Sequence, residues 1–527
     1  MKNQILHIFK NDVRHFWREI VLMAAIVAAY GWHTSTHSQE SGFDAMDIGF
    51  SFSSQILSLL VSVSFIFLIV RAVHAECPVG DRQFWVTRPY DWRHLLAEKV
   101  LFVLAFVNVP LFVLQVFLVW HAGFGPARHI SGLLDSQWQW VLRVILPVAT
   151  LAAVTASTGQ FVLAVLGTLV YLFAEQALVM KIPNTGVMNA ADIPTAITTY
   201  GTYAAAILVV LWQYARRCTI RSRTVLLGVA AAIPILFAVT PYRTVIAHLH
   251  PAPAPESPLP VQLAFDPVKP ASLKGGYPER NKVHITLPIR VSGIAEGSKV
   301  ALTGRWVRIE VPGGPSWDSG WEAQNETLLA GRPHTSEIFA LERDFFERVK
   351  SAPANVHLAL ALGPARAREV ERVVAGPGPF SFPHDGKCSF PPFARGRAVC
   401  FFPPQKTDWT ERMLLSAKSE EITCNPEENA KPLPAGTIAY GWVWQMGNFG
   451  LNPVSASELY VSDSGAPDVP TFRGNVCPGT LLTVYAGWQG GQRYRADLEI
   501  NGIHLAEYKL DDSVSPEAGG FGVMVPQ

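Results

Sequence analysis

Long apolar runs crowd the first 245 residues and limit what this chain can fold into. A helix that crosses a bilayer needs about 20 predominantly apolar residues. Seven runs come near that length, and the first lacks the small-residue cleavage signature of a signal peptide. They lie at residues 19–36, 50–70, 100–120, 138–157, 160–180, 202–214 and 224–242. The sequence therefore predicts an α-helical membrane domain of about seven transmembrane helices over residues 19–245.

Successive loops between membrane spans lie on alternating sides of the membrane, and the basic residues divide unevenly between the two sides. The N-terminal segment and the loops on its side hold thirteen of them, whereas the loops on the opposite side hold only Arg128 and Lys181. The thirteen are Lys2, Lys10, Arg14, Arg18, Arg71, Arg82, Arg88, Arg93, Lys99, Arg216, Arg217, Arg221 and Arg223. Because cytoplasmic loops carry the excess of Lys and Arg, we expect a cytoplasmic N-terminus. An odd number of crossings then places the chain after Tyr242 outside the cytoplasm, and we expect the membrane to be a bacterial inner membrane.

The six cysteines fit this orientation. Cys77 and Cys218 fall in predicted cytoplasmic loops, where thiols stay reduced. The other four fall in the exported part, where disulfides persist: Cys388, Cys400, Cys424 and Cys477. Four cysteines allow three pairings, and the sequence leaves all three open, together with the alternative of four buried thiols.

The exported part begins after a proline-rich segment, residues 246–260, which is typical of a stiff linker. Beyond it, in KVHITLPIRV and NVHLALAL, apolar residues recur at every second position, as they do in strands. Asn501 and Gly502 predict the tight turn of a hairpin within RYRADLEINGIHLAEYKL, and EIFALERDFFERVK predicts a helix. We expect a mainly-β extracytoplasmic domain over residues 261–527, in two β-sandwich lobes that divide near 376–386.

Motifs of catalysis are missing from the sequence. It has no His-Glu-x-x-His zinc helix, no Gly-x-Ser-x-Gly elbow and no Walker A loop. His248 and His250 could hold a metal, but two such histidines beside a membrane boundary are more often interfacial side chains. The net charge of +1 gives no field that would attract nucleic acid. We therefore expect no enzymatic activity, no metal, no directly bound cofactor and no nucleic-acid partner.

Polar residues inside the apolar runs are few, and four of them are candidate functional residues. A lone charge at the middle of the bilayer costs roughly 3 kcal/mol on insertion scales, so such groups usually face protein or water. Arg143 and Glu175 lie toward the outer ends of neighbouring antiparallel runs, where they could pair. A structural role and a role along a substrate path both stay open for the set, which is Asn108, Gln115, Arg143 and Glu175.

Two segments are suited to contacts at the inner membrane surface. Residues 1–18 place apolar side chains at helical spacing with cations opposite, which predicts an interfacial amphipathic helix. The loop DRQFWVTRPYDWRHLLAEKV mixes charges with large aromatics, and a second helix starts after Pro89. Such a loop is suited to docking a partner. The alternative is an aromatic belt at the depth of the lipid headgroups.

At this loop the sequence resembles the permease subunits of type-2 ATP-binding-cassette exporters. The matching residues are Asp81, Phe84, Trp85, Thr87, Arg88, Pro89, Leu95, Leu96 and Lys99. The tight turn at 157–159 and the longer outer loop before the sixth run resemble the same family. The resemblance covers about 220 residues, whereas the seventh run and the added C-terminal exported β domain depart from the family's six-helix pattern.

The resemblance implies a machine of more than one subunit. A separate cytoplasmic ATPase would dock on the loop and supply ATP-driven motion, and the permease would work as a homodimer or as a pair of permease chains in membrane lipid. Phe84 and Trp85 would be hydrophobic anchors of that contact, while Arg88 and Arg93 would fix its register. Two other classes stay open: a membrane-anchored extracytoplasmic sensor or scaffold without transport activity, and, less favoured, a membrane-bound hydrolase.

Overall fold

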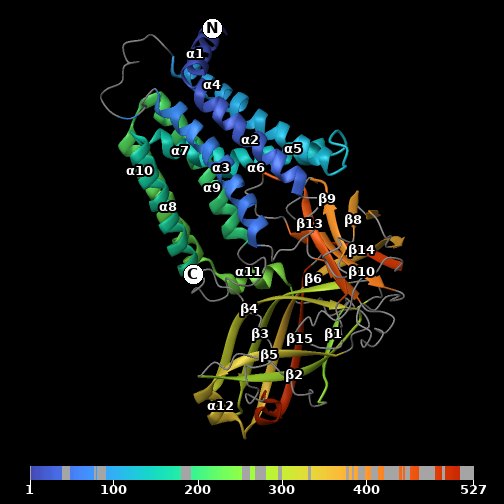
Figure 1. Ribbon diagram of the computed structural model, residues 1–527. Helices are drawn as coiled ribbons and strands as arrows, with labels where there is room; N and C mark the ends of the chain where they lie inside the picture. The colour runs from blue at the N-terminus through green and yellow to red at the C-terminus, as the bar shows by residue number, and fades with distance from the viewer. Residues whose placement is uncertain are drawn as a thin grey trace.

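The computed structural model has a bundle of helices in the first half of the chain and antiparallel sheets in the second half (Figure 1). It describes residues 2–37, 48–75, 79, 91–179, 192–251, 261–267, 281–294, 299–329, 334–374, 379–382, 385–389, 398–404, 413–419, 438–441, 443–444, 451–461, 481–489 and 493–510. The coarse division into a helical membrane part and a β-rich part, which the sequence predicts, is therefore confirmed.

The helical half contains long helices, and two of them include a π-helical turn, which is wider than a turn of α-helix. The segments are α1 (Lys2–His15), α2 (Trp17–His37), α3 (Ile48–His74), α4 (Trp92–Val103), the π-helical turn η2 (Leu104–Asn108), α5 (Val109–His121), α6 (Ile130–Trp140), the π-helical turn η3 (Val141–Ile145), α7 (Leu146–Ala153), α8 (Thr158–Val179), α9 (Asp192–Arg216), α10 (Thr219–Val239) and α11 (Tyr242–Leu249). Helix α4 continues through η2 into α5, and α6 continues through η3 into α7.

Five of these helices, within the part of the chain that the structure describes, are long and apolar enough to cross a membrane. They are Ser53–His74, Trp92–His121, Thr158–Leu178, Pro194–Arg216 and Thr219–Val239. The chain is thus a membrane protein by helix length and composition. Two of the seven predicted runs, those at 19–36 and 138–157, are helical but fall outside this set. The sixth run belongs to a longer helix than its 202–214 core suggests.

Each π-helical turn ends two residues before a proline. Pro110 follows η2, and Pro147 follows η3. Proline has no backbone N–H, and its ring collides with the carbonyl four residues earlier in a regular helix. Those carbonyls belong to Phe106 and Arg143, which lie inside the two widened turns. The prolines therefore account for the position of both turns, and such turns are frequent at functional sites.

The strands of the second half form two antiparallel sheets. The strands are β1 (Gln262–Phe265), β2 (Lys282–Ser292), β3 (Lys299–Glu310), β4 (Ser316–Leu329), β5 (His334–Glu342), β6 (Pro353–Val374), β7 (Phe380–Phe382), β8 (Gly386–Ser389), β9 (Ala398–Phe402), β10 (Met413–Ser419), β11 (Ile438–Gly441), β12 (Val443–Trp444), β13 (Ser455–Val461), β14 (Leu481–Gln489) and β15 (Tyr494–His504). One sheet has the order β1-β2-β5, and the other runs β4-β3-β6-β14-β10-β11-β13-β9-β8-β7, with β12 on β13 and β15 on β6.

Strand β6 joins the two parts of the larger sheet. Its first half pairs with β3 on one side and β15 on the other, and its second half pairs with β14. At 22 residues, β6 extends through both parts as one continuous strand. The regions before and after 374 are therefore connected by backbone hydrogen bonds as well as by sequence.

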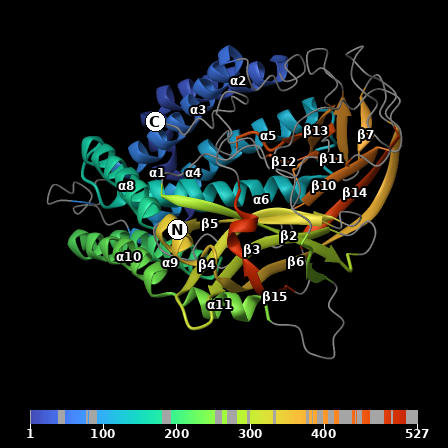
Figure 2. The same cartoon turned by 90° about the horizontal axis from the view of Figure 1, so that it is seen from below.

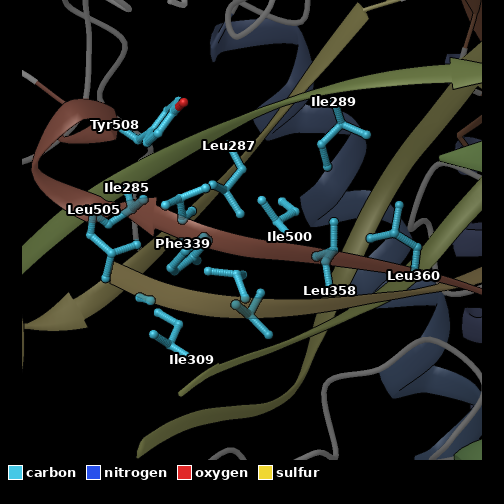
Figure 3. Packing of buried hydrophobic residues seen from close by; sticks show 14 of the residues in the cluster. Ile285, Leu287, Ile289, Ile309, Phe339, Leu358, Leu360, Ile500, Leu505 and Tyr508 are labelled. Carbon is cyan, nitrogen blue, oxygen red and sulfur yellow. The ribbon is translucent and has the colours of Figure 1, made fainter. Parts of the chain in front are cut away.

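One hydrophobic core lies between the three-stranded sheet and the first part of the larger sheet (Figure 3). In β2, every second residue from Val283 to Val291 is buried in it, as the alternation in KVHITLPIRV predicts. Val356, Leu358, Leu360 and Leu362 of β6 confirm the second alternating pattern in the same way. Because a strand points successive side chains to opposite faces, this period fixed which residues enter the core.

Two local predictions in this region are wrong. Asn501 and Gly502 do not turn the chain back; they form a bulge inside β15, between Ile500 and Ile503. Gly502 has a φ of +71°, and its N–H donates to the side chain of Asn355. The segment EIFALERDFFERVK divides into the end of β5 and a short helix, α12 (Arg343–Val349). Pairing with β2 overrides the helical preference of the first six residues.

The bundle has two distinct ends. Helix α1 and the start of α4 lie at the end far from the sheets, whereas α11 and the turn between α5 and α6 lie next to the sheets (Figure 1). Seen from below, α8 and α10 stand on one side of the bundle, and α2 and α5 stand on another (Figure 2). Contacts at these two ends carry most of the polar chemistry described below.

Candidate functional site

The predicted docking loop is described only where it becomes helix. Asp81, Phe84, Trp85, Arg88 and Pro89 lie outside the described residues. Arg93 lies in the first turn of α4, where its backbone N–H donates to the side chain of Asp91 at 3.1 Å. An aspartate at this position satisfies an N–H that the helix leaves without a partner, so Asp91 fixes the start of α4. The guanidinium of Arg93 lies 5.5 Å from the ring centroid of Trp92.

Helix α1 packs on α4 directly after this loop. Phe9 stacks on Phe106 with a centroid distance of 5.8 Å, and Phe16 meets Phe102 edge to face at 5.9 Å. Phe16 and Phe102 are both fully buried. In contrast, Leu6 and Trp17, two further apolar residues of the segment 1–18, are more than half exposed. The aromatic side chains therefore attach the N-terminal helix to α4 at the end of the bundle.

A buried ion cluster ties the same two helices. The ammonium of Lys99 lies 2.5 Å from a carboxylate oxygen of Asp12 and 3.2 Å from one of Glu98. All three side chains are less than a tenth exposed. Removal of one member of a buried pair leaves an uncompensated charge, which typically costs about 3–5 kcal/mol. A displacement of α4 at this point therefore moves α1 with it.

Polar contacts also connect the ends of other helices at the same end of the bundle. His74, at the end of α3, lies 3.1 Å from the hydroxyl of Thr155 and 3.1 Å from the carbonyl of Ala152. The guanidinium of Arg223, in α10, donates to the carbonyl of Val154. Arg71 of α3 is within 3.7 Å of Glu19 in α2. Basic residues from the N-terminal segment, α3, α4 and α10 thus share one end, as the charge pattern predicts.

A chain of amide side chains links α5 to α6 inside the bundle. Asn108 donates to Gln137 at 3.2 Å, Gln137 donates to Gln115 at 2.8 Å, and Gln115 donates to Ser136 at 2.9 Å. Asn108, Gln115 and Gln137 are at least nine-tenths buried. Hydrogen bonds between buried polar groups hold helices in one register. Sequence reasoning identified Asn108 and Gln115 but missed Gln137 and Ser136, which lie just before the fourth apolar run.

Two charged residues are predicted within the apolar runs, Arg143 and Glu175. Arg143 is exposed on η3, and Glu175 is half-buried on α8. Their pairing, which the sequence positions allow, stays a prediction. Tyr171, one turn before Glu175, donates its hydroxyl hydrogen to the carbonyl of Ala230 in α10 at 2.6 Å.

A hairpin of the β part touches the opposite end of the bundle. Lys387 donates to the carbonyl of Gly123 and lies 5.1 Å from the ring centroid of Phe124, in the turn between α5 and α6. Asp385 lies 3.6 Å from Arg128 and 3.8 Å from His129 of the same turn. We call these contacts between the β7–β8 hairpin and the α5–α6 turn the clamp.

Apolar side chains support the clamp. Val119, Phe124 and Leu133 form a buried cluster against which Phe401 and Val454 pack. Leu451 is fully buried in the main core of the bundle, among residues such as Phe65 and Trp140. The clamp therefore combines surface charges with apolar contacts that come from two separate segments of the β part.

A disulfide lies directly beside the clamp. Cys388 in β8 and Cys400 in β9 are opposite each other in the sheet and are bonded. Lys387 and Phe401, which both touch the helical part, are the next opposite pair. This bond is one of the three pairings that the sequence allows. Cys424 and Cys477 lie outside the described residues.

A second contact joins the two parts through α11. Tyr242 and Ile246 of this helix are buried against Trp321 of β4 and against Ala359 and Ala361 of β6. Arg243 lies 3.6 Å from Asp318. At its end, His250 is buried, with Nε2 3.4 Å from the hydroxyl of Thr303. We call this contact the α11 joint.

Two histidines lie near the end of the α11 joint, His248 and His250. Burial, and next the positive charge of Arg493, lowers the pKa of His250 to about 4, so the imidazole is neutral at pH 7. His248 is exposed on the other side of α11. Groups of three or more His, Cys, Asp or Glu side chains that could hold a metal are absent among the residues that the structure places.

No protein-family model matches the sequence, and no curated protein matches it.

Proposed function

We propose that this chain is the membrane-spanning permease subunit of an ATP-driven exporter. A separate cytoplasmic ATPase of the ATP-binding-cassette class would bind the loop between α3 and α4 and drive efflux through the helix bundle. The chain would bind no cofactor itself, and ATP would act through the partner. The working unit would be a homodimer or a pair of permease chains surrounded by membrane lipid.

The observation that carries this proposal is the buried ion cluster of Lys99, Asp12 and Glu98. Glu98 and Lys99 follow Arg93, the last residue of the proposed ATPase-binding motif, by five and six residues, and the contact of Lys99 with Asp12 links α4, the helix that follows the loop, to α1. Force applied to the loop would therefore reach two helices at once. A simple membrane anchor has no need of such a link, because single helices span a bilayer without one.

The proposed topology has seven spans. To the five apolar helices we add α2 and the continuous helix from Ile130 to Ala153, the two remaining long helices of the described bundle. The N-terminus would then be cytoplasmic in a bacterial inner membrane, and the β part, which we take as two sandwich lobes, would be outside. The gathering of basic side chains at the α1 end supports this orientation.

Trp85→Ala tests the proposal directly. The full-length chain would be co-expressed with a candidate ATPase, chosen as a neighbouring gene that encodes Walker motifs, and ATP hydrolysis would be measured after joint reconstitution into liposomes. Aromatic anchors typically cost about 2 kcal/mol or more when truncated, so stimulation of the ATPase should fall about thirtyfold or more. Trp138→Ala, at an exposed tryptophan of α6, is the matched control and should keep full stimulation.

The alternative is an extracytoplasmic sensor or scaffold without transport activity. Its support is the size of the β part and its attachment to the bundle at two places, the clamp and the α11 joint. In that case the wild-type chain would leave ATP hydrolysis unchanged, and Trp85→Ala would have nothing to reduce. Equal stimulation by the wild type and by Trp85→Ala would instead remove the docking role of the loop.

A further inference from the structure

The β part is attached to the helix bundle at two places that belong to different helices. The α11 joint holds it to α10 and α11, and the clamp holds it to the turn between α5 and α6. Strand β6 connects the two attachments, because its first half carries Ala359 and Ala361 of the joint and its second half pairs with β14. From β14 the sheet continues through β10, β11, β13 and β9 to β8.

We propose that the β part is a brace across this end of the bundle. Through the clamp it restrains the α5–α6 turn relative to α10 and α11, and it limits how far these helices separate. The brace does not depend on the permease assignment, because it follows from contacts within one chain.

The restrained unit is the outer half of α5 together with α6. The amide chain from Asn108 to Ser136 links these two helices, so they move together. Each is continuous with a π-helical turn, η2 before α5 and η3 after α6. Widened turns are the places where a helix bends most readily. The clamp lies on the α5–α6 turn, away from both widened turns, and therefore acts at the free end of this unit.

The disulfide keeps the clamp residues in position. Lys387 precedes Cys388, and Phe401 follows Cys400, so the bond fixes the two strands at the residues that touch the bundle. Asp385, at the hairpin turn, has a φ of +59°, a conformation that non-glycine residues rarely adopt. Reduction would release the constraint on this hairpin without altering the α11 joint.

Gly123 gives a sharp test of the clamp. Its φ is +80°, and a Cβ added there would lie 2.5 Å from the ammonium nitrogen of Lys387. Gly123→Ala therefore displaces Lys387 and strains the turn. Gly125 lies in the same turn with no heavy atom within 4 Å of a Cβ at its position, so Gly125→Ala is the matched control. Lys387→Met removes the same contact while leaving the backbone of the turn intact.

The experiment is hydrogen–deuterium exchange of the full-length chain in lipid nanodiscs, without ATPase or nucleotide. We expect Gly123→Ala, Lys387→Met and the Cys388→Ser/Cys400→Ser pair to raise exchange in residues 121–130 by about tenfold, the factor that loss of one charged hydrogen bond corresponds to. Exchange in residues 242–250 should stay unchanged, and Gly125→Ala should behave as the wild type.

Three results would overturn the brace. The first is unchanged exchange at residues 121–130 in Lys387→Met and in the cysteine pair. The second is an equal rise at residues 242–250, which would indicate general loosening. The third is a rise in Gly125→Ala as large as that in Gly123→Ala. Since the measurement involves no partner, failure of the brace and failure of the permease assignment are separate outcomes.

Discussion

The α11 joint and the clamp hold the same β part to the same bundle, but they are built differently. The joint follows directly in sequence from α10 and is mainly apolar, with Ile246 fully buried against the sheet. The clamp joins residues 264 positions apart, Gly123 and Lys387. Its ion pair between Arg128 and Asp385 is largely exposed, at 76% and 48% of the side-chain surface.

These differences indicate different roles. A buried apolar contact beside a continuous chain cannot separate far, so the α11 joint is a fixed attachment. Exposed ion pairs contribute only about 0–1 kcal/mol each, and a charged hydrogen bond contributes about 1.5–3 kcal/mol. The polar part of the clamp is therefore within the range that a conformational change can break and form again, while Leu451 and Phe124 keep the surfaces in register.

Among the changes that test the difference between the α11 joint and the clamp, Ile246→Ala should have the largest effect on stability. Removing a fully buried isoleucine side chain typically costs about 2–5 kcal/mol. We expect the free energy of unfolding of the β part to fall by about that amount, measured by pulse proteolysis of the full-length chain in urea. Thr244→Ala, at an exposed position of α11, should change it by less than about 0.5 kcal/mol. Equal losses in both variants would contradict a role for the buried face.

Acidification should weaken the joint next most strongly. Burial lowers the pKa of His250 from 6.5 to about 4. The unfolded chain therefore binds a proton near pH 6.5 that the folded joint does not bind. Stability is full above pH 6.5 and falls as the pH decreases toward 4. Between pH 7 and pH 5 the loss is about 2 kcal/mol from this residue.

His250→Gln isolates that loss. Glutamine keeps a hydrogen-bonding group near Thr303 but does not titrate. The difference in unfolding free energy between wild type and variant should shrink as the pH falls from 7 to 5. Burial raises the pKa of Glu337, so protonation of this side chain stabilises the fold as the pH falls, opposite to His250. Because Glu337 is present in both proteins, its effect cancels in the difference between wild type and variant. A difference that is constant with pH would show that His250 does not titrate in this range.

Sequence patterns predicted those strands in which every second side chain is buried in the same core. The alternation in β2 and β6 was sufficient because each of their alternate residues meets the same core. Long apolar runs located five described helices that are long and apolar enough to cross a membrane, because a bilayer requires about 20 apolar residues in succession, although the predicted ends were off by several residues. The prediction failed at Asn501 and Gly502, which the sequence pattern placed in a hairpin turn. The residues before and after them belong to one strand, β15, and both sides pair with β6, so the two residues form a bulge.

The polar contacts were harder to predict because both partners come from distant segments. Asn108 and Gln115 stand out as polar residues in apolar runs, but their partner Gln137 lies in a mixed segment with no signal of its own. Nothing in the sequence near Gly123 indicates that Lys387 will reach it. The Cys388–Cys400 bond was one of three options, and only the register of β8 and β9 selects it.

Arg128→Ala, in the clamp, should have the smallest effect of these changes, and this effect should depend on salt. The pair with Asp385 is exposed, so its loss should raise hydrogen–deuterium exchange in residues 121–130 by less than about fivefold, the equivalent of 1 kcal/mol. Exposed pairs are screened by salt, and the Debye length falls from about 10 Å at 0.1 M to about 3 Å at 1 M. The difference between Arg128→Ala and wild type should therefore disappear at 1 M NaCl.

The α11 joint supplies the control for that measurement. Arg243 lies 3.6 Å from Asp318, the same separation as Arg128 from Asp385, and is similarly exposed. Because Arg243 belongs to the joint, Arg243→Ala should leave exchange at residues 121–130 unchanged at any salt concentration. If it loosened the turn as much as Arg128→Ala does, the joint and the clamp would not be independent attachments, and the β part would respond as one rigid surface.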